Sequence, residues 1–308
     1  MNETLILHHY ELSPYAEKIR LMLGQTGLPW QSVLSPEQPP RPNVDPLTGG
    51  YRRIPVGQIG ADVFCDTFVI AEEIARLGDA PALDPANASE DDARIIATAE
   101  EEVFFAAIGG VSPVTLIGTM LRNFGVVGTI KFAMDRARLM QGATIEPPTG
   151  KRAKETMQSF LETLEATLAQ REFLGGTSPN LADFSAFHPL WLYATTSRQP
   201  LDARYDNVRR WYERVAAIGH GTREEISPEN AFEAARSTNP RPLPVDGAGD
   251  ARIGVEVSVA PSDYGTVPVE GTLVALSETR CILKRETEAF GTVHVHFPRR
   301  GFSVSTPG

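Results

Sequence analysis

Cysteine and positive charge are both scarce in this chain of 308 residues. Its only cysteines are Cys65 and Cys281, which are too few and too far apart for a disulfide framework and suit a reducing compartment. Lys and Arg number 29 against 39 Asp and Glu, so the formal net charge is −10. No basic stripe is long enough to follow a phosphate backbone, and nucleic acid is therefore not expected as a partner.

Long uncharged apolar runs are also rare. The N-terminus has no basic region before an apolar stretch, so we expect no signal peptide and a cytoplasmic location. One run, Val103 to Leu121, has 19 residues without a charge and is long enough to span a bilayer. Gly109-Gly110 and Ser112-Pro113 interrupt it and predict the end of one helix and the start of the next. We expect no membrane partner.

Three short motifs within the first 70 residues carry the chemistry. Ser13-Pro14 follows the apolar run Leu5 to Leu7 and has the pattern of a helix N-cap and first helical residue. Ile54-Pro55-Val56 follows about forty residues later, and Asp66-Thr67 then precedes another apolar run. Each motif alone is ordinary helix-start, turn or edge-strand material. Their order and spacing together are specific.

In that order and spacing the three motifs resemble the glutathione transferase superfamily, most closely its tau and omega classes. The resemblance implies a thioredoxin-like α/β domain over residues 1–80 that binds glutathione, in which Ser13 is the catalytic residue. Its hydroxyl would donate a hydrogen bond to the glutathione sulfur, at a helix N-terminus that also favours the thiolate. Pro55 would be the family's structural cis-proline, which presents the backbone of Val56 to the cysteinyl part of glutathione.

The resemblance also assigns the two ends of glutathione. The carboxylate of Asp66 would take the γ-glutamyl ammonium, and Thr67 would take the γ-glutamyl carboxylate. Arg53 would hold the glycyl carboxylate. Cys65 stands beside this site, and we interpret it as a small buried filler rather than as a reactive thiol.

Residues 87–237 have the pattern of an all-helical domain. Apolar residues recur on one helical face at Met157, Leu161, Leu164 and Leu168. Asn180-Leu181-Ala182-Asp183 resembles the capping motif of the family's second domain, which gives Asp183 a structural role. In the family, the helices near residues 104–124 line the pocket for the electrophile.

After a proline-rich linker the sequence pattern changes again. Residues 251–305 alternate as strands do, which predicts a small β domain outside the resemblance, as a barrel or a meander of four or five strands. We expect this extension to have its own small core, to pack on the helical domain or on a second subunit, and to be dispensable for glutathione binding. His294 and His296 are spaced as a metal pair would be, but with no partner evident we expect a polar outer face and no metal.

The resulting hypothesis is a dimeric cytoplasmic glutathione transferase. Glutathione would be its co-substrate, an apolar electrophile its second substrate, and the reaction conjugation or isomerisation. The alternative is a non-catalytic glutathione-binding scaffold whose β extension recruits a partner.

Overall fold

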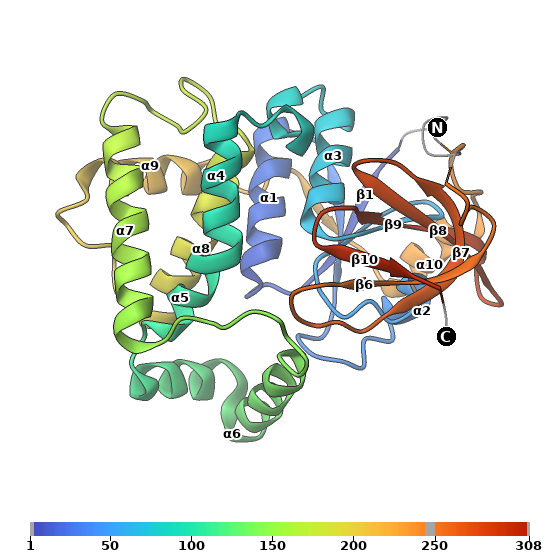
Figure 1. The fold of residues 1–308 in the computed structure, drawn as a ribbon, viewed down its shortest axis with the longest axis horizontal. Coiled ribbons are helices and arrows are strands. Elements are labelled where there is room, and N and C mark those ends of the chain that lie inside the picture. Colours follow the sequence, from blue (N-terminus) through green and yellow to red (C-terminus); the bar gives the residue numbers. More distant parts are fainter. Residues whose placement is uncertain (1–2, 244–249, 307–308) are drawn as a thin grey trace.

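The computed structural model describes residues 3–243 and 250–306, which form one long sheet beside a block of helices (Figure 1). The sheet has ten strands in the order β10-β6-β7-β8-β9-β4-β3-β1-β2-β5. Its strands are β1 (Leu5–His9), β2 (Trp30–Leu34), β3 (Val56–Ile59), β4 (Asp62–Cys65), β5 (Arg223–Glu225), β6 (Glu256–Pro261), β7 (Val269–Leu276), β8 (Arg280–Thr287), β9 (Gly291–Pro298) and β10 (Phe302–Ser305).

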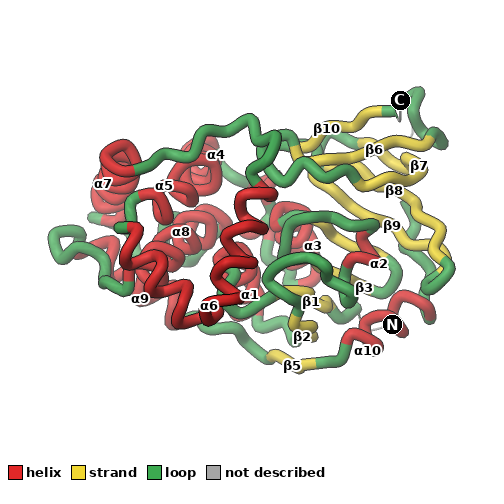
Figure 2. Tube along the Cα trace, turned by 90° about the horizontal axis from the view of Figure 1, so that it is seen from below, coloured by secondary structure: helices red, strands yellow, loops and turns green. Residues whose placement is uncertain are grey.

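The helices lie mostly at the end of the molecule away from the extension, as Figures 1 and 2 show. They are α1 (Pro14–Thr26), α2 (Asp45–Thr48), α3 (Thr67–Leu77), α4 (Glu90–Thr98), α5 (Phe104–Gly109), α6 (Pro113–Leu139), α7 (Gly150–Leu168), α8 (Leu181–Ser197), α9 (Asp206–Ala217) and α10 (Pro228–Arg236). Two short 3₁₀ turns, η1 (Pro81–Leu83) and η2 (Pro85–Asn87), follow α3, and a π-helical turn, η3 (Ala99–Val103), joins α4 to α5.

The N-terminal domain has the thioredoxin-like arrangement that the sequence predicts. β1 pairs with β2 in parallel and with β3 antiparallel, and β3 pairs with β4 antiparallel. Ser13 caps α1, Pro14 is its first residue, and Gly27 ends it with a left-handed φ of 65°. The helix start therefore lies directly after the loop that leaves β1.

The helical domain also follows its sequence pattern, with one exception. The predicted face of α7 is buried, and Asn180 with Asp183 forms the capping box of α8. Asp183 accepts further bonds from the Leu174 amide at 2.7 Å and the Trp211 indole at 2.7 Å, so it ties the start of α8 to two other segments. The exception is the segment between α9 and α10, which was expected to be helical. It forms strand β5 and pairs with β2 at the edge of the sheet.

The extension joins the sheet of the N-terminal domain. β6, β7, β8 and β9 form an antiparallel meander, β10 returns beside β6, and β9 pairs in parallel with β4. We expected the extension to pack on the helical domain or on a second subunit. Its main contact in the described chain is instead with strand β4 of the N-terminal domain. Isolated strand patterns cannot specify which sheet edge they will extend, because every edge offers the same unpaired backbone groups.

The expectation that the extension has a core of its own is wrong. One buried apolar cluster contains side chains from both sides of the β4–β9 pair, so the two parts share a core. The N-terminal domain contributes Val44, Leu47, Tyr51, Val56, Ala61, Val63 and Cys65, and the extension contributes Val257, Val259, Val269, Leu273, Cys281, Leu283, Phe290, Val293, Val295 and Phe297.

The expected polar outer face at His294 and His296 is also wrong. Both residues are buried at the β4–β9 junction, and His296 Nε2 lies 2.8 Å from a carboxylate oxygen of Asp62. Burial lowers the pKa of His296. Burial alone would raise the pKa of Asp62, but the hydrogen bond with His296 and the charge of Arg241 outweigh it, so the pKa of Asp62 is lowered. The missing acidic partner comes from β4, far away in the sequence.

No single helix among the described residues passes a length and hydropathy test for a membrane span. The bent pair Glu90–Gly109 and Pro113–Leu139, with 95° between its parts, passes that test only when taken together.

Candidate functional site

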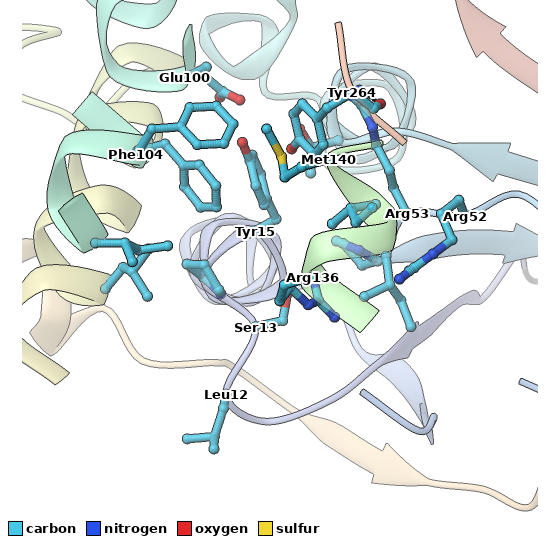
Figure 3. A pocket seen from close by; sticks show the side chains of 18 of the residues that line it. Leu12, Ser13, Tyr15, Arg52, Arg53, Glu100, Phe104, Arg136, Met140 and Tyr264 are labelled. Atoms are coloured by element: carbon cyan, nitrogen blue, oxygen red, sulfur yellow. Dashed lines mark hydrogen bonds between the residues drawn. The ribbon is translucent and has the colours of Figure 1, made fainter. Parts of the chain in front are cut away.

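A cavity of about 630 Å³ lies where the N-terminal domain, the helices and the extension meet. Five of the predicted site residues line it, and Figure 3 shows part of its wall. These five are Ser13, Arg53, Pro55, Asp66 and Thr67. The three sequence motifs therefore converge on one space, although up to 54 residues separate them in the chain.

Ser13 lies at the N-terminus of α1 with its side chain almost fully buried. Its Oγ accepts a hydrogen bond from the Ala16 amide at 3.2 Å. A hydroxyl that accepts in this way still has its proton to donate. An anion placed beside Ser13 would meet both that proton and the positive end of the helix dipole.

Asp66 and Thr67 form the start of α3. Asp66 has a φ of 108°, a strained value for a residue with a side chain, and its carboxylate accepts the Phe68 amide at 3.0 Å. Burial raises the pKa of Asp66. Among residues 3–243 and 250–306 no Lys, Arg or His lies within ion-pair distance of this carboxylate, so an incoming ammonium group would find a ready partner.

The second motif brings Ile54 and Pro55 to the cavity but not Val56. The Ile54-Pro55 bond is cis, as expected, and both residues line the cavity. Val56 does not line it: the residue is buried in β3, between His8 of β1 and Cys65 of β4. Ile54, directly before the proline, does line it.

Arg53 lines the cavity but is already occupied by the extension. Its guanidinium forms an ion pair with Asp263 and donates to the Tyr264 carbonyl at 2.6 Å. The Tyr264 ring lies against the same guanidinium, 4.1 Å from its carbon. A ligand carboxylate would therefore share Arg53 with Asp263.

The apolar wall comes from the helices that the sequence indicated. Phe104, Phe105 and Ile108 of α5 line the cavity, as do Leu116 and Met120 of α6. Part of the uncharged run from Val103 to Leu121 thus borders the cavity, whereas Val114 and Ile117 are exposed on α6. α6 itself has no buried residue and changes direction at Gly125, where φ is 65° and ψ is −177°.

Sequence reasoning missed most polar residues of the cavity, among them one from each of three separate elements. Tyr15 stands two positions after Ser13, Glu100 lies in the π-helical turn η3, and Tyr264 comes from the extension. Glu100 forms a 2.6 Å ion pair with the buried Lys18. Burial alone would raise the Glu100 pKa, but Lys18 and His188 hold it well below its usual range. Of these three, only Tyr15 could have been found from the sequence, because it directly follows the Ser-Pro motif. Glu100 and Tyr264 lie outside every motif that the sequence analysis used.

Burial agrees with the interpretation of Cys65 as a filler, and it applies to Cys281 as well. Cys65 and Cys281 are both fully buried and free, and burial raises the pKa of each thiol. Neither is a low-pKa reactive thiol. In the part of the chain that the structure describes, no group of three or more His, Cys, Asp or Glu side chains is arranged to hold a metal ion.

Comparison with known proteins assigns the family. The family model for the glutathione S-transferase N-terminal domain matches residues 7–82, and that for the C-terminal domain matches residues 144–214. A solved GST-like protein from Pseudomonas syringae is 34% identical, with a TM-score of 0.76, over 98% of this chain and 99% of that one. The chain belongs to the glutathione S-transferase superfamily. Because that match spans nearly all of both chains, this transferase-like chain shares its C-terminal extension with the Pseudomonas protein.

Other solved transferases resemble the chain only weakly. A glutathione S-transferase from Actinobacillus pleuropneumoniae is 16% identical, covers 75% of this chain and 92% of its own, and has a TM-score of 0.45. A tau class transferase from mango is 15% identical, covers 77% of this chain and 99% of its own, and has a TM-score of 0.47. A comparison with curated proteins gave no significant match.

Proposed function

We propose that this protein activates the thiol of glutathione for attack on an apolar electrophile. Glutathione would lie along the N-terminal domain with its sulfur at Ser13, and the electrophile would occupy the side of the cavity bordered by α5 and α6. The products would be a thioether conjugate or an isomerised substrate. We propose a cytoplasmic homodimer as the working form.

The buried carboxylate of Asp66 carries this proposal. It faces the cavity without a cationic partner among the described residues, while Thr67 and the start of α3 offer a hydroxyl and the helix dipole beside it. An amino acid head group has an ammonium and a carboxylate on one carbon, which suits this pair. The γ-glutamyl end of glutathione is such a head group.

The remaining parts of glutathione then follow along the cavity. The backbone of Ile54, which precedes the cis-proline, takes the role that the sequence gave to Val56 and would pair with the cysteinyl part. Arg53 would take the glycyl carboxylate in competition with Asp263. Ser13 would donate its hydroxyl proton to the thiolate, and the sulfur would attack the electrophile.

The test is the pKa of the bound thiol. Replacing Ser13 with Ala removes one hydrogen bond to a charged sulfur, worth about 1.5 to 3 kcal/mol, so the thiol pKa should rise by roughly one to two units. Glutathione affinity should stay within a few-fold. Ultraviolet titration of the bound thiolate measures the first quantity, and calorimetry measures the second.

Ser227→Ala is the matched control, because Ser227 also precedes a proline and caps a helix, by accepting from the Asn230 amide at 3.2 Å. Both variants lose an N-cap, which costs about 1 kcal/mol of folding stability. Only Ser13→Ala should change the thiol titration. An equal titration curve in both would leave Ser13 as a cap alone and would favour the scaffold hypothesis, provided that electrophile turnover is also absent.

A further inference from the structure

Helix α6 is apolar on two sides, and only one of them faces the protein. The inner side, with Leu116, Met120 and Phe132, lines the cavity. On the outer side, apolar residues recur three and four positions apart both before and after the bend of the helix. Residues with this spacing share one face of a helix, so each half has an apolar stripe. We call the two together the outer stripe, which consists of Val114, Ile117, Leu121, Val127, Ile130 and Met134.

The outer stripe is strongly exposed to solvent. Val114 is 84% exposed and Val127 is 66% exposed, and none of the six described residues of the stripe lines the cavity. Figure 1 shows α6 at the lower rim of the molecule, outside the other helices. Apolar residues that are exposed together, rather than singly, mark a surface that another molecule covers.

The inner side of α6 is fastened to the rest of the protein. The Thr119 hydroxyl donates to the Thr196 carbonyl of α8 at 3.1 Å. Asp135, the only acidic residue of α6, forms ion pairs with Arg52 and Arg136. These contacts come from both halves of the helix, so the structure holds the outer stripe toward solvent.

Positive charge surrounds the outer stripe, although the chain as a whole has a net charge of −10. Residues 103–154 contain seven Lys or Arg and two Asp or Glu, which gives this region a net charge of +5. Lys131 and Arg138 follow Val127 by four and eleven positions and therefore border the stripe. Among residues 3–243 and 250–306, no carboxylate lies within ion-pair distance of Arg122, Lys131 or Arg138.

The combination of apolar and basic residues distinguishes between possible occupants of this surface. Nucleic acid would match the cations, but its interfaces are polar and would leave the apolar stripe unsatisfied. A second copy that docks through the same face would bring like charges together. An anionic lipid surface matches both features, because acyl chains receive the apolar side chains and headgroups receive the cations.

We propose that the outer stripe of α6, with its bordering Lys and Arg residues, docks the protein on an anionic membrane surface. This site goes beyond the proposed reaction and does not depend on it. We expected no membrane partner because the sequence has no clear spanning segment, but a helix that lies in the membrane surface needs none. Because the inner side of α6 lines the cavity, docking would place the cavity beside the lipid.

Co-sedimentation of the full-length protein with vesicles tests the site. One set of vesicles contains equal parts of phosphatidylglycerol and phosphatidylcholine, and the other contains phosphatidylcholine alone. We expect binding to the anionic vesicles to be at least about tenfold tighter, because each Lys or Arg beside an anionic surface raises the partition coefficient about fivefold. Added salt should weaken this binding, since it screens the charges.

A pair of charge variants locates the basic part of the site. The double variant Lys131→Gln with Arg138→Gln should bind the anionic vesicles about tenfold more weakly or worse. Arg94→Gln with Arg210→Gln is the matched control, because it removes the same charge from exposed positions on α4 and α9. The control should bind within about twofold of the unsubstituted protein.

A second pair locates the apolar part. Val127→Ser with Ile130→Ser should also weaken binding to the anionic vesicles by about tenfold, because two side chains no longer enter the lipid. Val255→Ser with Val267→Ser is the control, since both valines are similarly apolar and exposed but belong to the extension. All four substituted positions are exposed, so circular dichroism should show unchanged melting.

Two results would overturn the proposal. One is equal binding, or no binding, to the two kinds of vesicle by the unsubstituted protein. The other is binding that the α6 variants lower no more than their controls do. If the α6 variants instead reduce the molar mass in analytical ultracentrifugation and vesicles are not bound, a second copy covers the stripe and the membrane proposal is wrong. None of these measurements uses glutathione, so each outcome leaves the proposed function to its own test.

Discussion

The side chains on the two sides of the cavity are positioned in different ways, by local helix caps on one side and by strand pairing on the other. On the side of the N-terminal domain, Ser13 and Asp66 are N-caps of α1 and α3, so the short segments around them place both side chains. On the side of the extension, Asp263 and Tyr264 lie about 200 residues further along the chain and arrive through the pairing of β9 with β4. The comparison teaches that local helix caps place the polar side chains on one side of the cavity, whereas long-range strand pairing places those on the other.

The largest expected effect comes from removing the extension. Deleting residues 250–308 would uncover the edge of β4 and the N-terminal half of the shared apolar cluster. Each large apolar side chain that returns to water loses about 1.5 to 3 kcal/mol, and several together match a total stability of about 5–15 kcal/mol. We therefore expect no cooperative thermal transition in circular dichroism.

A point substitution tests the same junction without shortening the chain. Val295 is buried in β9 beside Val63 of β4, whereas Val267 is 45% exposed in the loop before β7. Val295→Asp should lower Tm strongly, and Val267→Asp should change it little. A soluble truncated protein that melts cooperatively and binds glutathione within a few-fold would instead show that the first two domains are complete alone.

The next largest effect concerns the N-terminal side. Asp66→Ala removes the carboxylate proposed to bind the ammonium group, and should weaken glutathione binding by about 2 kcal/mol, or roughly thirtyfold. Isothermal titration calorimetry measures this. Asp91→Ala is the control, because Asp91 is exposed on α4 and does not line the cavity. Unchanged affinity in Asp66→Ala would place the head group elsewhere.

The smallest expected effect concerns the ion pair between Arg53 of the N-terminal domain and Asp263 of the extension. Asp263→Asn removes the carboxylate that competes for Arg53, so glutathione should bind about threefold more tightly if its glycyl carboxylate uses this guanidinium. The glycyl ethyl ester of glutathione lacks that charge and should bind both proteins equally. A gain that is the same for the ester would mean that Arg53 serves the extension and not glutathione.

The site residues that the sequence predicted converge in space where local rules apply. Five of the six proposed contact and cis-proline residues line one cavity, because N-caps and a proline turn are fixed by neighbours within a few positions. Val56 does not line the cavity, whereas Ile54, two positions earlier, does. The motif marked the proline, but the choice between the residue before it and the residue after it depends on which strands flank β3.

The sequence by itself determined the elements of this protein: the capped helices, the buried stripe of α7, the strands after residue 250 and the family. Tertiary structure alone decided that β9 extends the sheet at β4, that Asp62 pairs with His296, and that Tyr264 and Tyr15 line the same cavity. The physical reason is the distance along the sequence over which each interaction acts. Capping and periodicity act over one to four residues, whereas strand pairing and core sharing depend on which surfaces remain uncovered after the whole chain has folded.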